Sequence, residues 1–228
     1  MIRFQNSDTL QRNIRQDDWP ELGIPTLDLV RQAILEGDTE RALEFLEYSR
    51  DESVTIHDVL AAQVSDSITH IASSGEENLI KLLRQLFTPL VKNFLATTPE
   101  AKEAVQRYTE FQRGHFSNIT ITEEPDRYVV KCDPCGSGGR LMRTKDIART
   151  KQAYPWSWGK KGIPYYCLHC CVAWEIIATE IRGYPMRITM APDKPEDPCI
   201  AFFYKKPELI PQEFFARVGK TPPSLGQG

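Results

Sequence analysis

The chain has 228 residues, of which 41% are hydrophobic and 26% are charged, and its net charge is −3. This mixture is typical of a globular protein with one large domain or two small ones. No apolar run approaches the roughly 18 residues of a transmembrane helix, which excludes a membrane span. Residues 1–20 are polar and lack the apolar core of a secretory signal, so we expect a cytoplasmic protein without a membrane partner.

The charges are distributed unevenly along the chain. Residues 131–161 contain eight Lys and Arg against Asp133 and Asp146, while residues 1–130 carry the excess of Asp and Glu. A basic segment that also contains aromatic residues is one way of binding nucleic acid. The acidic remainder and a pI near 5.9 do not favour a dedicated nucleic-acid binder.

The first half of the chain has the apolar period of α-helices. After an irregular arm (residues 1–24), we expect five amphipathic helices that form a bundle over residues 25–113. The first would pack through Leu27, Val30 and Ile34, and the second would bury Leu43 and Leu46. Their expected ranges are 26–35, 39–50, 55–75, 76–95 and 99–113.

The pattern then changes to the alternation of β-strands. A hairpin is expected at residues 117–132, a further strand after the glycine-rich segment 136–139, and a short strand ending at Cys167. One long helix over residues 170–183 and two strands, 186–192 and 199–206, follow. We therefore predict an α+β fold, with a helical bundle followed by an antiparallel-sheet domain (residues 114–215) and a tail (residues 216–228).

Two Cys-x-x-Cys pairs stand out in the second half. Cys132 with Cys135, and Cys167 with Cys170, have the spacing of two knuckles that together give one metal ion four thiolates. A reducing compartment makes metal or redox chemistry more consistent with such pairs than structural disulfides. We predict Zn²⁺ bound by these four residues as a staple of the sheet, with an open catalytic site as the alternative.

Other residues near these motifs are candidates for binding or catalysis. His115 lies between the predicted helices and the predicted sheet, and His169 lies between two predicted metal ligands. Both are candidate acid–base residues, with a structural role as the alternative for each. Trp156 and Trp158 lie in a loop with two lysines, and they and Arg140 are candidate substrate-binding residues. Among the remaining cysteines, we expect Cys171 and Cys199 to be buried.

The second half resembles a known domain. The segments "YVVKCDPC", "YYCLHC" and "DPCIAFFYK" resemble the domain shared by four-vinyl-reductase-type ligand-binding proteins and the L-2-amino-thiazoline-4-carboxylate hydrolase group, over about residues 117–206. The counterparts are Cys132, Cys167 and Cys199. This chain differs by doubling two of these cysteines into Cys-x-x-Cys pairs. The resemblance implies an α+β domain that binds a small molecule, with or without transforming it.

Two narrower resemblances involve shorter segments. The combination of "PCGSGGRL", "YCLHCC" and "YKKPELIP" looks like an uncharacterised bacterial zinc-binding family. The segment "AILEGDTERALEFLE" is similar to the helical cap of corrinoid methyltransferases, whose corrinoid-binding half has no counterpart here.

These observations predict a zinc-containing enzyme that performs hydrolase- or lyase-like acid–base chemistry on a small polar substrate. The reaction would take place in a pocket between the helices and the sheet domain. One alternative is a ligand-sensing or partner-binding module with a purely structural zinc. A second is a zinc-ribbon nucleic-acid binder. The sequence leaves the substrate and the oligomeric state open and is compatible with a homodimer.

Overall fold

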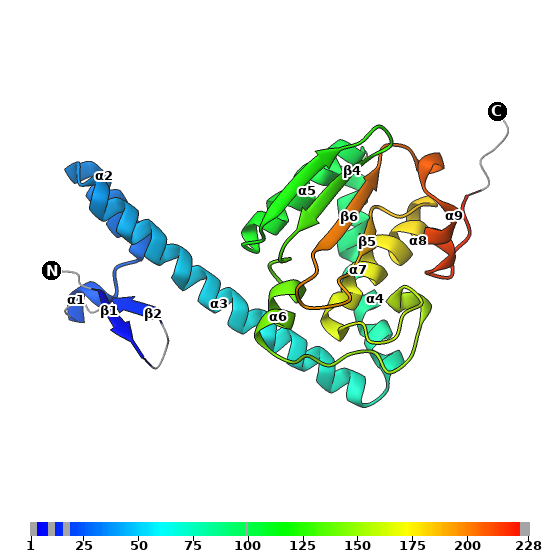
Figure 1. Ribbon diagram of the computed structural model, residues 1–228, viewed down its shortest axis with the longest axis horizontal. Helices are drawn as coiled ribbons and strands as arrows, with labels where there is room; N and C mark the ends of the chain where they lie inside the picture. The colour runs from blue at the N-terminus through cyan, green and yellow to red at the C-terminus, as the bar shows by residue number, and fades with distance from the viewer. Residues whose placement is uncertain (1–3, 9–11, 16–18, 99, 224–228) are drawn as a thin grey trace. The chain divides into compact units, whose positions relative to one another are not determined.

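The computed structural model describes residues 4–8, 12–15, 19–98 and 100–223 (Figure 1). The chain divides into two compact units, residues 1–57 and residues 58–228. The long helix α3 (Thr39–Ser73) contributes residues to both units. Within the described ranges, no helix is both long and apolar enough to cross a lipid bilayer.

The first unit is more ordered than its sequence indicated. Where we expected an irregular arm, strands β1 (Phe4–Ser7) and β2 (Arg12–Arg15) form an antiparallel pair, followed by α1 (Trp19–Leu22). Helix α2 (Thr26–Glu36) ends at Gly37, whose φ of 77° is the left-handed conformation that glycine adopts without strain. Each strand is only four residues long, which is too short for a clear alternating pattern.

The helices of this unit pack through a different face from the predicted one. The buried residues are Leu29 and Ala33 of α2 with Ala42 and Phe45 of α3. The small alanine side chains occupy the contact and leave room for Phe45. The prediction that α3 buries Leu43 and Leu46 is wrong, because these side chains are 56% and 49% exposed. Leu27 and Ile34 of α2 are also exposed.

Helix α3 replaces the two helices that we expected over residues 39–50 and 55–75. Residues 51–54, Asp-Glu-Ser-Val, contain neither glycine nor proline, so nothing in them forces a helix to end. The helix continues to Ser73, and Gly75 with a φ of 130° separates it from α4 (Glu76–Thr97). Helix α4 runs through Pro89 without ending.

The second unit contains the predicted antiparallel sheet. The strands are β3 (Ile119–Glu123), β4 (Arg127–Cys132), β5 (Ile188–Met190) and β6 (Cys199–Tyr204), in the order β3-β4-β6-β5. All neighbouring strands are antiparallel. The predicted hairpin and the last two predicted strands are confirmed. Helix α5 (Ala101–Gly114) lies against the sheet, where the rings of Tyr108 and Phe203 are 5.4 Å apart.

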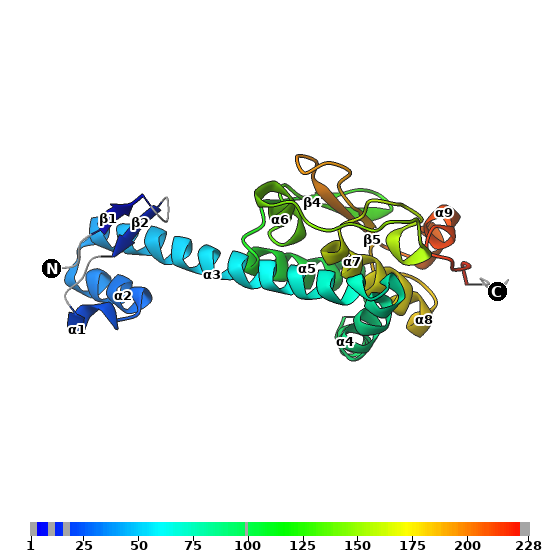
Figure 2. The same cartoon turned by 90° about the horizontal axis from the view of Figure 1, so that it is seen from below.

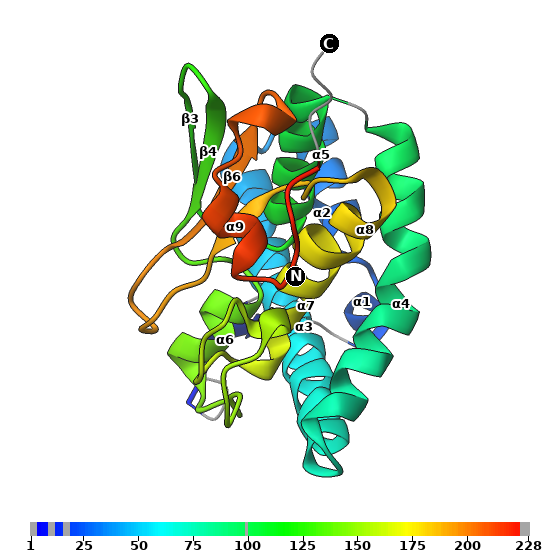
Figure 3. The same ribbon diagram turned by 90° about the vertical axis from the view of Figure 1, so that its right-hand side faces the viewer.

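The predicted long helix is also present, with an irregularity in its middle. It begins as a 3₁₀ turn, η2 (Tyr165–Cys167), and continues through α7 (Leu168–Cys171), the π-helical segment η3 (Val172–Ile177) and α8 (Ala178–Arg182). Gly183, with a φ of 89°, ends it as predicted. We refer to the whole segment as the central helix. It packs against α4 and lies between α4 and the sheet (Figures 2 and 3).

Two predicted strands are helical instead. Residues Gly138–Thr144 form helix α6, where we expected a strand, and Tyr165–Cys167 belong to the central helix. The apolar residues Leu141 and Met142 of α6 pack against Ala61, which explains an apolar run that alternation alone could not assign. The remaining elements are η1 (Pro155–Ser157), η4 (Pro207–Leu209) and α9 (Gln212–Ala216). Residues 224–228, the end of the predicted tail (residues 216–228), lie outside the described residues.

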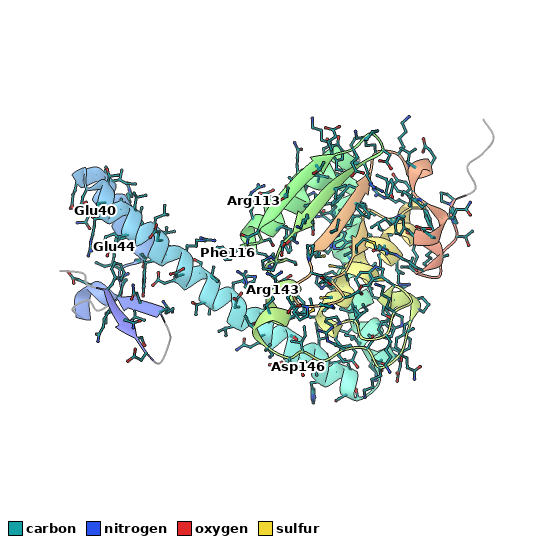
Figure 4. All side chains as sticks on the ribbon, viewed as in Figure 1. Glu40, Glu44, Arg113, Phe116, Arg143 and Asp146 are labelled. Atoms are coloured by element: carbon teal, nitrogen blue, oxygen red, sulfur yellow. The ribbon has the colours of Figure 1, made fainter. Side chains whose placement is uncertain are left out.

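The glycine-rich segment after Cys135 is required for a close approach of two chain segments. Phe116, with a φ of 56°, turns the chain after α5, and Gly136 lies against the backbone just before it (Figure 4). A Cβ atom on Gly136 would lie 1.8 Å from the carbonyl oxygen of His115. The Gly136 N–H also donates a hydrogen bond to Ser117 Oγ at 2.6 Å.

We expect Gly136→Ala to lower the free energy of unfolding by about 1–3 kcal/mol, because the backbone has to move to admit the methyl group. Gly114→Ala is the matched control, since a Cβ there has no atom within 4 Å. That change should alter stability by no more than about 1 kcal/mol, in the stabilising direction. Urea unfolding of the two variants measures both values, and equal stabilities would contradict the close approach.

Candidate ligand pocket and thiol cluster

The second unit contains a cavity of about 900 Å³, which we call the pocket. It is lined by residues of α3, α4 and α5, of the central helix and of the segment before β5. A volume of this size is within the range of small-molecule binding sites. The pocket therefore lies between helices and the sheet region, and all of its lining residues belong to residues 58–228.

The apolar part of the lining comes largely from α3 and α4. The spacing of Leu60, Val64 and Ile68 on α3 is that of a helix face packed in a bundle. Ile68 is buried in the core, whereas Leu60 and Val64 are about half exposed, and all three line the pocket. The apolar side chains of α4 that line the pocket are Leu82, Leu83, Leu86, Phe87, Leu90 and Phe94. The two helices thus present part of their apolar surface to a cavity.

A small group of polar side chains from the central helix and the segment before β5 also lines the pocket. His169 and Cys170 are in α7, and Arg187 comes just before β5; all three line the pocket. The Sγ atom of Cys170 lies 3.5 Å from Nε2 of His169 and accepts a hydrogen bond from Nη2 of Arg187 at 3.2 Å. Nδ1 of His169 is 2.6 Å from the carbonyl oxygen of Tyr166. Because a carbonyl oxygen only accepts, Nδ1 carries a proton and Nε2 faces the thiol.

This arrangement favours a thiolate at Cys170. Burial alone would raise the pKa of the Cys170 thiol, but the nearby His169 and Arg187 outweigh it and hold that pKa at about 6. Burial likewise opposes the charged form of His169, yet the neighbouring Cys170 raises the pKa of the imidazole. In contrast, burial raises the pKa of Cys132 to about 11 and that of Cys171 well above its usual value.

The cysteines predicted as metal ligands lie close to this wall. Cys135, Cys167 and Cys170 line a second, small cavity of about 30 Å³, together with Cys199 but not with Cys132. Within the described parts of the chain, no three His, Cys, Asp or Glu side chains are placed so that they could hold a metal ion. The side chains as placed do not fit a tetrahedral zinc site. Zinc therefore stays a prediction from cysteine spacing, and no step below depends on it.

Of the other predicted site residues, one lines the pocket and three do not. His115 follows α5, its ring lies tilted against that of Phe111 with centroids 4.3 Å apart, and it lines the pocket as His169 does. Trp158 is buried, and Trp156 stacks on Tyr154 in the same loop. Arg140 donates hydrogen bonds to the carbonyl oxygens of His115 and Gly136. Neither tryptophan nor Arg140 lines the pocket, so this cavity does not support their predicted role in substrate binding.

Most of the basic side chains of residues 131–161 have partners within the second unit. Arg143 donates to Asp133 and to the carbonyl oxygens of Pro195 and Glu196, beside α6 (Figure 4). Lys145 pairs with an acidic residue of α3, and Lys160 pairs with one after β5. This segment is therefore held to the fold by its charges and does not form an unpartnered basic patch of the kind that nucleic-acid binding requires.

The pocket wall depends on a buried carboxylate on the other side of the central helix. Glu175 is fully buried, and its side chain accepts hydrogen bonds from Nε1 of Trp158 at 2.7 Å and from the backbone N–H of Thr189 at 2.8 Å. Nη2 of Arg217 lies 2.7 Å from Oε2 and 2.9 Å from Oε1. We call these four residues the Glu175 cluster. It joins the central helix to the loop, to β5 and to the C-terminal segment.

The roles of two residues in this region do not follow from the sequence pattern. Arg187 lies in an apolar strand-like segment, "MRITM", whose pattern indicates only a strand. A single charged residue in a segment expected to be buried is itself a signal of a buried ion pair or a ligand site. Cys170 was assigned only as a metal ligand, and its neighbour His169 as a separate candidate, although they form a pair.

Comparisons with known proteins add no assignment, because no family model, no curated protein and no solved structure matches this chain.

We expect Arg217→Met to lower the free energy of unfolding by about 3–5 kcal/mol at pH 7, because it leaves the Glu175 carboxylate buried without its cation. Burial already raises the pKa of Glu175 despite Arg217, and removing Arg217 raises it further. A raised pKa means that the protonated acid is favoured in the folded state. The loss of stability should therefore shrink as the pH falls towards 5.

The control is Arg84→Met, which removes a partly exposed pair with Glu180 whose atoms are 2.8 Å apart. An exposed pair contributes about 0–1 kcal/mol, so this variant should unfold almost like the unmodified protein. Thermal unfolding at pH 5 and pH 7 provides the comparison. A small, pH-independent effect of Arg217→Met would mean that Glu175 does not need its partner.

Proposed function

We propose that this protein binds a small molecule with a large apolar part in the pocket of the second unit. The observation that carries the proposal is the lining itself: a cavity of about 900 Å³ to which α3 and α4 contribute a series of Leu, Val, Ile and Phe side chains. Large apolar side chains that remain half exposed favour an occupant that removes them from water. The resemblance to a ligand-binding domain in the sequence is consistent with this function.

The polar groups support a specific, oriented ligand rather than a general apolar surface. Binding sites combine an apolar lining with a few placed polar groups that fix the ligand's orientation. Here His169, Cys170 and Arg187 form one connected polar group in the lining, next to the ring of Phe87 in α4. The ligand would direct a polar group towards these three side chains and its apolar part along the half-exposed Leu60 and Val64 of α3.

The test uses decanol, a neutral molecule with an apolar chain, and isothermal titration calorimetry. Val64→Trp places a bulky ring on the half-exposed wall of α3, and we expect it to weaken decanol binding roughly ten-fold or more, about 1.4 kcal/mol. Leu43→Trp is the matched control, because it adds the same ring to an exposed position of the same helix outside the pocket. Failure of decanol to bind the unmodified protein, or equal weakening in both variants, would reject the proposal.

A second candidate function is an enzyme that uses Cys170 as a nucleophile. The specific observation is a pair of contacts. His169 Nδ1 lies against the Tyr166 carbonyl, and this orients Nε2, a base, beside the Cys170 thiol. In ester hydrolysis, the Cys170 thiolate would attack the carbonyl carbon, and the leaving alkoxide would take a proton from His169 and depart as the alcohol. His169 would then accept a proton from the water that attacks the thioester, and pass it to the departing Cys170 sulfur as the acid is released. This is the hydrolase-like chemistry expected from the sequence, with a nucleophile in place of metal-bound water.

For this second candidate, p-nitrophenyl decanoate is the substrate. We expect a burst of one equivalent of nitrophenol and an acyl group on Cys170, detected by peptide mass spectrometry. Cys170→Ala should abolish both signals. Cys171→Ala should retain them, because Cys171 is fully buried and its Sγ contacts the Pro155 carbonyl. Equal bursts from the unmodified protein and Cys170→Ala would exclude the nucleophile and leave the binding function intact.

A further inference from the structure

Arg187 is held in the pocket wall with part of its guanidinium group unpaired. The residue is only 5% exposed. Its guanidinium carbon lies 4.4 Å from the ring centroid of Tyr108 and 5.3 Å from that of Trp174, so two aromatic faces fix its plane. Nε donates to Thr189 Oγ1 at 3.4 Å, and Nη2 donates to Cys170 Sγ at 3.2 Å.

These two hydrogen bonds leave donors of Arg187 unused. A guanidinium group has five N–H donors. Among the described residues, no group accepts a hydrogen bond from Nη1, and the protein does not fully enclose this atom. A ligand can therefore reach Nη1, although the rest of the Arg187 side chain is buried. Since Arg187 lines the pocket, this opening faces the pocket.

The hydrogen-bond partners of Arg187 include no carboxylate. Nε and Nη2 donate to a hydroxyl and to a thiol sulfur, and aromatic rings lie beside the guanidinium group. The cation is therefore buried without a carboxylate bonded to it.

A buried cation with a reachable, unused N–H is a receptor for an anion. We infer that the pocket's ligand is an apolar monocarboxylate, with its carboxylate on Arg187 and its hydrocarbon part along α3 and α4. This inference rests on the proposed function and names the class of molecule that it concerns. The planar guanidinium group matches the planar carboxylate.

The experiment compares three molecules of equal chain length by calorimetry with the full-length protein: decanoate, decanol and decylammonium, below their micelle-forming concentrations. We expect decanoate to bind at least about ten-fold more tightly than decanol, and decylammonium to bind more weakly than decanol. If decanol binds as tightly as decanoate, the carboxylate inference is overturned and the apolar pocket remains. If none of the three binds, the proposed function itself fails.

Arg187→Met assigns the difference to this side chain, because methionine keeps the apolar stem and removes the donors. It should reduce decanoate affinity to that of decanol and leave decanol binding unchanged. The control is Arg107→Met, which also changes a pocket-lining arginine, but one whose Nη1 already donates to Thr97 and Thr98. It should leave the preference for decanoate intact.

Near-ultraviolet circular dichroism shows whether Arg187→Met retains the fold. If that variant does not fold, Arg187→Lys serves instead. Lysine keeps the charge but lacks the planar fork, so the ratio of decanoate affinity to decanol affinity should fall but stay above one. A decanoate preference that survives in either folded variant at its original strength would assign the anion to another group and overturn the inference.

Discussion

The second unit depends most on the carboxylate of Glu175, which is buried without any contact to solvent. A carboxylate in such a place is costly unless its oxygens are bonded and its charge is paired. Here an indole N–H, a backbone N–H and a guanidinium group meet that need, and they come from three separate parts of the chain. The central helix can therefore occupy its place only when the loop, β5 and the C-terminal segment occupy theirs.

The pocket side of the same helix shows the opposite arrangement. Arg187 is almost as buried as Glu175, but its partners are a thiol, a hydroxyl and two aromatic rings rather than a carboxylate. A buried charge that is completely satisfied stabilises a fold, whereas one that keeps an unused donor directed at a cavity is available to a ligand. The π-helical segment between the two sites contributes Trp174 to the pocket and Glu175 to the interior. Such segments often occur at functional sites.

Much of the fold could be predicted from the sequence, because segments with a clear apolar period and clear end signals form the expected helices and strands. The hairpin around Pro125 and the helix that ends at Gly183 are examples. The failures have physical causes. Helix α3 continues because Asp51 to Val54 permit a helix as well as a loop, and α6 was mistaken for a strand because seven residues are too few to show a period.

The site was harder to predict, because period alone cannot distinguish an apolar face that packs from one that lines a cavity. Leu60 and Val64 have the spacing of core residues, and only the separation of the surrounding helices leaves space beside them. The chemistry of that space is then decided by very few groups. Without Arg187, the pocket would bind any apolar molecule of suitable size by burial, with little discrimination. In the ligand that we propose, the single buried guanidinium group favours a negative charge at one end. It also penalises cationic molecules, whose charge would face its own.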